Sequence, residues 1–330
     1  MPNRPIAESP EAKRSGAEPG AAGSSLEVEI SGIRFAHPVL SAPGPLGFGH
    51  EVQSVMDLRV FAGFITKSVT IEPREGHAYP HMAKTEGGYL NSLGLPNLGL
   101  AGFLTRDMPF LRTLGVPIIV SAAAHTVAEF VTLVDWLSPE PGVCAVELNV
   151  SCPNVEAGMT FGVDARLTYE LVSALRPATQ LPLWVKLTPN VTDITVVARA
   201  AQDAGADALS VANTVTGMAI DVHTRRPKLG AVTGGLSGPA IRPVAVYLTW
   251  QVSRACTIPV IGMGGIATAD DALEFLIAGA RAVAVGTAVI DNHGAPTQIR
   301  QGLAAYLARH GLSSVNDIVG TLAGSEASHA

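Results

Sequence analysis

Short apolar segments alternate with amphipathic helical patterns along most of the chain, and this alternation constrains the fold most strongly. Eight apolar segments are strand candidates, because parallel strands covered by helices on both faces are apolar throughout. They are residues 38–41, 63–67, 117–122, 144–150, 183–187, 208–213, 259–263 and 282–285. Eight strand–helix units predict an α/β fold, a (β/α)8 TIM barrel. The alternative is a doubly wound open sheet, but residues 42–49 place prolines where that fold usually carries its G-x-G-x-x-G turn.

Helix-capping residues support these units. Thr126 and Glu129 have the spacing of a capping box, in which each side chain bonds the backbone of the other residue. Asp164 and Asp193 precede helical patterns and are expected as N-caps. Gly205 is expected to end the second of these helices in the left-handed conformation.

Composition divides the chain into two parts. Residues 1–25 are rich in Pro, Ala, Gly, Ser and charged side chains, so we expect a disordered tail. Residues 26–330 are expected to form one barrel domain. It begins with a short β-hairpin, in which residues 26–30 and 33–35 are the strands and residues 31–32 the turn.

Charge and cysteine content exclude several classes of protein. There are 22 Lys and Arg residues against 28 Asp and Glu, a net charge of −6, which argues against nucleic-acid or anionic-membrane partners. Three cysteines without a C-x-x-C pair indicate neither a disulfide framework nor a metal site. We find no signal peptide and no apolar run of about 18 residues, so we expect a cytoplasmic protein without membrane spans.

Polar or glycine residues end every predicted strand, where a barrel places its active site. Gly262-Met263-Gly264-Gly265 and Gly286-Thr287 follow the last two strands, and glycine lets backbone N–H groups approach an anion closely. These two turns predict a phosphate site. Lys67 and Lys186 end two further strands, and a buried lysine needs an anionic partner, so we expect a bound anion there.

Cys152 lies in the polar turn Ser151-Cys152-Pro153-Asn154, directly after a strand. A thiol in this position can act as an acid or base, or as a covalent nucleophile. Cys144 and Cys256 have apolar neighbours and are expected in the core.

Amide side chains gather at the same rim. They are Asn91, Asn149, Asn154 and Asn213, and residues 87–97 form a long insertion that is expected to cover this face. Amides offer donor and acceptor together, which suits a ligand with alternating C=O and N–H groups, such as a pyrimidine ring.

Seven runs resemble the dihydroorotate dehydrogenases. They read TKS (66–68), NSLGLPN (91–97), ELNVSCPN (147–154), VKLTPN (185–190), TGGLSGP (233–239), IGMGG (261–265) and VGT (285–287), in the family's order. The resemblance covers about residues 27–320. It implies an FMN-containing barrel that oxidises dihydroorotate to orotate in pyrimidine biosynthesis, with a hydride passing from substrate C6 to flavin N5.

The resemblance also implies the roles of individual residues. Cys152 would take the substrate C5 proton, as in class 1 enzymes, whereas class 2 enzymes have serine there and a membrane-associated extension. Lys186 would face the flavin N1 side, and Lys67 would contact flavin and substrate. The substrate-binding set would be Lys67, Asn91, Ser92, Leu93, Gly94, Leu95, Asn149, Asn154, Asn213 and Thr214. The FMN-binding set would be Ser41, Lys67, Ser68, Ser121, Asn149, Lys186, Ala212, Gly238, Gly264, Gly265, Gly286 and Thr287.

Different parts of the chain resemble two different subclasses of the family. Residues 189–194 and 234–239 look like class 1B, which implies a homodimer with an FAD and iron–sulfur partner subunit that passes electrons to NAD. Residues 96–99 and Ser121 look more like the fumarate-using class 1A. We expect class 1B.

Departures from the family pattern leave other functions open. His81, Lys84 and Ser121 replace residues that the family tends to show, so acceptor or substrate could differ. A dihydropyrimidine dehydrogenase-like enzyme is one alternative. A sugar-phosphate lyase or isomerase, with Lys67 or Lys186 forming a Schiff base, is an alternative from another class.

Overall fold

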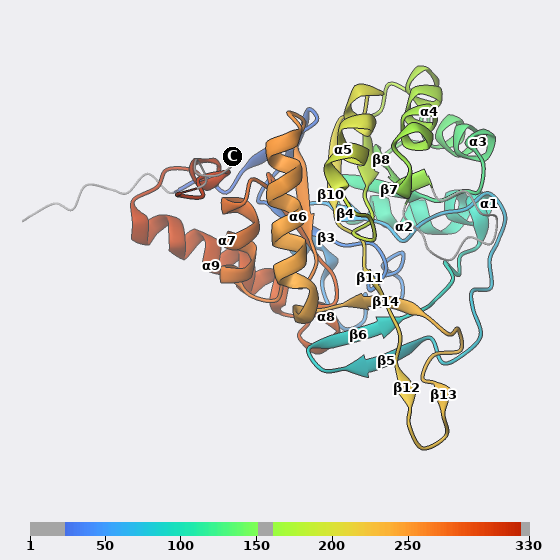
Figure 1. Ribbon diagram of the computed structural model, residues 1–330. Coiled ribbons are helices and arrows are strands. Elements are labelled where there is room, and N and C mark those ends of the chain that lie inside the picture. The colour runs from blue at the N-terminus through green and yellow to red at the C-terminus, as the bar shows by residue number, and fades with distance from the viewer. Residues whose placement is uncertain (1–23, 151–160, 325–330) are drawn as a thin grey trace, which may run out of the picture.

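Eight parallel strands form the centre of the computed structural model, which describes residues 24–150 and 161–324. From the second strand to the eighth, each pairs with the next one along the chain, and the eighth also pairs with the first (Figure 1). The strands are β3 (Val39–Ser41), β4 (Phe64–Ile65), β7 (Ile118–Ala122), β8 (Val143–Asn149), β9 (Leu183–Lys186), β10 (Ala208–Val211), β15 (Val260–Met263) and β16 (Ala282–Val285).

Hydrogen bonds between the first two strands close the barrel. Ser41 N donates to Gly63 O over 3.1 Å, and Ala62 N donates to Val39 O over 3.0 Å. The TIM barrel expected from the eight repeated units is therefore confirmed. The doubly wound alternative is wrong, because an open sheet would leave these two edges unpaired.

Helices surround this barrel, as Figure 1 shows. They are α1 (Gly99–Gly102), α2 (Met108–Arg112), α3 (Val127–Leu137), α4 (Ala165–Leu175), α5 (Ile194–Asp203), α6 (Arg242–Ala255), α7 (Ala269–Ile277), α8 (Ala288–Asp291) and α9 (Ala295–His310). Shorter turns are η1 (Leu58–Val60), the π-helical η2 (Phe103–Asp107), η3 (Phe161–Val163), η4 (Arg176–Ala178), η5 (Pro239–Ile241) and η6 (Val315–Ile318).

The predicted caps are present. Thr126 and Glu129 form the capping box of α3. Asp164 accepts a hydrogen bond from Leu167 N, and Asp193 accepts one from Thr195 N. Gly205 follows α5 with a φ of +101°, a conformation that glycine adopts without steric cost.

Several strands are shorter than the sequence suggests. The segments expected to end at Lys67 and Asn213 stop two residues earlier, at Ile65 and Val211. Lys67 N donates to Gly47 O in the first loop rather than to a barrel strand, which accounts for the early end of β4. These residues therefore belong to the rim rather than to the wall of the barrel.

An N-terminal hairpin lies at the amino end of the barrel, as expected. Its strands are β1 (Val28–Ile30) and β2 (Ile33–Phe35). The rings of Phe35 and Trp184 are 6.3 Å apart, and both side chains are fully buried. Ser25, just before the hairpin, forms a parallel bridge with Ser314.

A small antiparallel sheet lies at the opposite end, where the barrel strands end. It consists of β5 (Met82–Thr85), β6 (Gly88–Asn91), β14 (Gly234–Ser237) and β11 (Val215–Gly217). A further hairpin, β12 (Ile220–Asp221) and β13 (Arg226–Pro227), projects away from the body in Figure 1. The predicted insertion over the carboxyl-terminal face is thus part of this sheet.

We expect acid to destabilise the fold through His37. This buried side chain accepts a hydrogen bond from Val39 N at Nδ1, and burial lowers its pKa from 6.5 to about 4. The unfolded chain therefore binds the proton first, and stability falls as the pH drops from 6.5 towards 4, by about 1.4 kcal/mol per pH unit at most. Chemical denaturation across this range measures the loss.

The variant His37→Asn keeps an acceptor but cannot titrate, so its unfolding free energy should depend less on pH in that range. The matched control is His223→Gln, which removes an exposed histidine. Equal pH dependence in the His37→Asn protein and the control would contradict this role.

Candidate active site at the carboxyl-terminal rim

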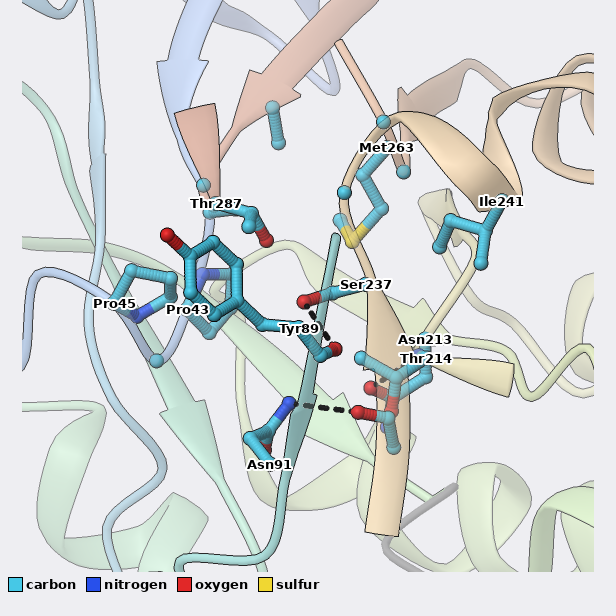
Figure 2. A pocket seen from close by; sticks show the side chains of 18 of the residues that line it. Pro43, Pro45, Tyr89, Asn91, Asn213, Thr214, Ser237, Ile241, Met263 and Thr287 are labelled. Atoms are coloured by element: carbon cyan, nitrogen blue, oxygen red, sulfur yellow. Dashed lines mark hydrogen bonds between the residues drawn. The ribbon is translucent and has the colours of Figure 1, made fainter. Parts of the chain in front are cut away.

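A cavity of about 420 Å³ lies where the barrel strands end and the small sheet covers them. Figure 2 shows its lining side chains, with Tyr89 and Thr287 on one side and Ile241 and Met263 on the other. Most of the residues predicted from the sequence line it. They are Lys67, Ser68, Asn91, Leu93, Gly94, Leu95, Asn149, Lys186, Ala212, Asn213, Thr214, Gly238, Gly264, Gly265, Gly286 and Thr287.

Three predicted residues lie behind this lining instead, and all three are fully buried. Ser41 Oγ accepts from Ile65 N over 2.7 Å, so it joins β3 to β4. Ser92 Oγ lies 2.8 Å from His77 Nδ1. Ser121 Oγ lies 3.0 Å from Ser68 Oγ. These serines can support the lining without forming it.

The predicted residues Cys152 and Asn154 lie outside the described residues. The preceding strand, β8, ends at Asn149. The roles expected for both residues stay predictions.

One wall of the cavity is polar and almost fully buried. Asn149 lies opposite Lys186 in the pairing of β8 and β9, and their exposed fractions are 8% and 6%. Asn149 Nδ2 donates to Ser68 Oγ over 2.9 Å. An amide fixed in this way and a lysine from the next strand can bind the same planar anion.

A second group of amides comes from the insertion and from the loop after β10. Asn91 Nδ2 donates to Gly235 O over 3.1 Å, which ties β6 to β14. Thr214 N donates to Asn213 Oδ1 over 2.8 Å. Figure 2 shows Asn91, Asn213 and Thr214 close together in the cavity. Three of the four amides expected from the sequence, Asn91, Asn149 and Asn213, therefore come together from distant parts of the chain.

Lys67 contributes a second cation beside this polar wall. Burial lowers the pKa of Lys67, and the carboxylate of Glu51 opposes that change. Glu51 is held by the first loop, because its Oε2 accepts from Phe48 N over 3.1 Å.

Glycines form the part of the cavity where a phosphate is expected. Gly264 and Gly265 have φ values of +126° and +78°. A Cβ atom on Gly265 would lie 2.8 Å from Gly238 O, so no larger residue fits without a shift. The turns at Gly264-Gly265 and Gly286-Thr287 line the cavity and bring backbone N–H groups to its wall. These groups can bind an anion at close range.

Two residues at or below the cavity were not predicted as site residues from the sequence. Tyr89 lines the cavity, and its hydroxyl donates to Asp291 Oδ1 over 2.6 Å, which connects β6 to α8. Glu147 lies in β8 below the cavity with no exposed surface. The sequence did carry a signal for Glu147, because an acid within an otherwise apolar strand is as unusual as a lysine there, which drew attention to Lys67 and Lys186.

The cavity fits FMN on two observations of the described residues. The glycine turns bring backbone N–H groups to the part of the cavity where a phosphate is expected, and Lys186 is a nearly buried cation in the polar wall, where it can stabilise negative charge on a bound ring. Among the described residues, no cluster of three or more His, Cys, Asp or Glu side chains could hold a metal ion. None of the described helices is both long and apolar enough to cross a membrane.

Comparison with known proteins gives one consistent family. The family model described as dihydroorotate dehydrogenase matches residues 25–307. Proteins named dihydroorotate dehydrogenase B (NAD(+)), catalytic subunit, are similar to the chain. The one from Geotalea uraniireducens is 47% identical over 298 residues, 90% of this chain and 98% of the relative. Those from Geobacter sulfurreducens and Desulforudis audaxviator are each 48% identical, over 90% and 89% of this chain and 98% and 96% of the relatives.

The glycine turn should be sensitive to a single methyl group. We expect Gly265→Ala to weaken FMN binding at least tenfold, because the new Cβ would displace Gly238 O or the start of α6. The control is Gly115→Ala, which has a similar φ of +67° but nothing within 4 Å of the added atom. Positive φ should cost both variants about 1 kcal/mol of stability. Fluorescence titration of the flavin-free protein with FMN measures the affinity, and equal affinities in the two variants would contradict the phosphate site.

Proposed function

The chain belongs to the dihydroorotate dehydrogenase family of oxidoreductases, and from this premise we propose that it is the FMN-binding catalytic subunit of a class 1B enzyme. The observation that carries the proposal is the cavity, which brings two lysines, three asparagine side chains and two glycine turns to one rim. Relatives named dihydroorotate dehydrogenase B, which corresponds to class 1B, are 47–48% identical to the chain over the aligned residues. The alignment covers nearly their whole length.

The glycine turns would hold the FMN phosphate, and Lys186 would lie beside the isoalloxazine ring. When bound, FMN would supply the hydride acceptor for substrate C6. The lysine is well suited to its place, because a fixed cation in a buried site stabilises negative charge that develops on a neighbouring ring.

Dihydroorotate would be recognised by the amides and by Lys67. Asn91, Asn149 and Asn213 offer donors and acceptors to the C=O and N–H groups of the pyrimidine ring. The ammonium of Lys67 would pair with the carboxylate that distinguishes dihydroorotate from dihydrouracil. This pairing favours dihydroorotate over the substrate of a dihydropyrimidine dehydrogenase-like enzyme.

Cys152 would remove the proton from C5 as the C5–C6 double bond forms, and orotate would result. A thiolate has a suitable basicity for this step, since the reference pKa of cysteine is about 8.5. Orotate is the substrate of the later reactions of pyrimidine biosynthesis.

Electrons would leave through another protein. The sequence holds only three cysteines, so it cannot supply four thiolates to an iron–sulfur cluster. NAD reduction would therefore need a partner subunit that carries FAD and such a cluster, on each copy of a homodimer.

The base assignment predicts the effect of Cys152→Ala. We expect flavin reduction by dihydroorotate to slow by about 10²–10⁴-fold, because general-base loss has this typical cost, while FMN stays bound. Anaerobic stopped-flow absorbance measures the rate. The control is Cys144→Ala, since Cys144 lies at the other end of β8. Wild-type reduction rates in the Cys152→Ala protein would show that another group takes the proton.

The partner model predicts where the electrons go. The isolated chain should reduce artificial acceptors with dihydroorotate but should reduce NAD hardly at all, and adding the partner subunit should restore NAD reduction. Steady-state assays with NAD, fumarate and a quinone measure these activities. Rapid NAD reduction by the isolated chain would refute the partner model, and rapid fumarate reduction would assign the chain to class 1A.

A further inference from the structure

A buried carboxylate lies beneath the cavity, and the proposed reaction does not use it. We propose that Glu147 is a positioning residue, the internal counter-ion of Lys186, and that it limits how strongly Lys186 stabilises the reduced cofactor. This inference rests on the proposed function, because it assumes that FMN binds over Lys186.

The strand register places Glu147 directly below the functional groups of the rim. It precedes Asn149 by two residues in β8, so both side chains point to the barrel interior, with Glu147 one layer deeper. Ser210, which pairs with Lys186 between β10 and β9, donates from Oγ to Glu147 Oε2 over 2.7 Å. The carboxylate is therefore held towards the strand that carries the lysine.

Electrostatics link the two side chains. Burial raises the pKa of Glu147, while the charge of Lys186 and the hydroxyls of Ser210 and Ser121 oppose that change. No described residue donates a hydrogen bond to the second oxygen, Oε1. Lys186 is thus the charged group on the described elements around Glu147 that can balance its charge, since β7 and β10 contribute only hydroxyls.

Stability alone gives no reason for this acid. A buried ion pair is often no more stabilising than apolar residues of the same volume, because both ions lose their hydration. The surrounding β8 residues Ala145, Val146 and Leu148 are apolar and fully buried. An acid at this place acts on the lysine above it.

The lysine would then have two anions to balance. One is Glu147 on the inner side, and the other is the negative charge that reduction adds on the cavity side. Removing the inner charge should leave more of the lysine's field for the reduced cofactor, so the midpoint potential should rise.

The variant Glu147→Gln tests this, because it keeps the shape and removes the charge. With FMN bound, at the alkaline end of the pH range in which the protein stays folded, we expect its reduction to be favoured at least tenfold more than in the wild type, which is about 30 mV for a two-electron couple. The control Ser210→Ala removes the hydrogen bond to Oε2 but keeps the charge, and should shift the potential less. Lys186→Met should lower the potential.

The pH dependence gives a second readout. Above the raised pKa of Glu147 its charge is present, so the wild-type and Glu147→Gln potentials should differ. As the pH falls through this pKa the wild-type carboxylate takes up a proton, and the two potentials should converge. A purely structural role would not produce convergence.

The outcomes separate the two proposals. If Lys186→Met lowers the potential but Glu147→Gln leaves it unchanged or lowers it, the counter-ion role is wrong and the proposed FMN site stands. If neither substitution changes the potential, Lys186 does not lie at the cofactor and both proposals are wrong there. If Glu147→Gln does not fold, the wild-type potential should still fall more steeply with pH than that of Lys186→Met, and parallel slopes would overturn the inference.

Discussion

Burial of charge inside a closed barrel is the constraint on which the rest of the site depends. Lys186 and Glu147 are 6% and 0% exposed, and neither can regain its hydration while the barrel stays closed. Each must therefore be balanced by a neighbouring group or by a ligand. Lys186 lines the cavity, and its charge opposes the rise that burial causes in the pKa of Glu147, so the same lysine can balance negative charge on a ligand at this wall.

The barrel also explains how residues far apart in the sequence meet. Parallel strands deliver all their carboxyl ends to one face, and the small antiparallel sheet adds Asn91 from β6 to that face. The same sheet is tied to α8 by the Tyr89–Asp291 hydrogen bond. The proposed substrate and cofactor sites would thus be joined by a few hydrogen bonds between otherwise separate elements.

Much of this arrangement was predictable, because short apolar strands, helix caps and strand-end residues are local signals. They gave the eight strands and the caps at Thr126 and Asp164, and together with the resemblance to the family they gave about half of the cavity lining. Strand ends and second-layer contacts were not predictable, since they depend on tertiary partners. Lys67 leaves its strand because its N–H bonds Gly47, and Ser41 and Ser121 lie behind the lining because they bond neighbouring strands and Ser68. Glu147 was visible in the sequence, but only the fold shows that it lies below Lys186.

The central claim is that this cavity oxidises dihydroorotate by means of bound FMN. The most direct measurement mixes the FMN-loaded chain with dihydroorotate or with dihydrouracil, without oxygen, and follows the flavin absorbance. Our account predicts rapid loss of the oxidised-flavin band with dihydroorotate and little change with dihydrouracil, which lacks the carboxylate proposed to pair with Lys67. A band that persists with dihydroorotate, or that disappears equally fast with dihydrouracil, would contradict it.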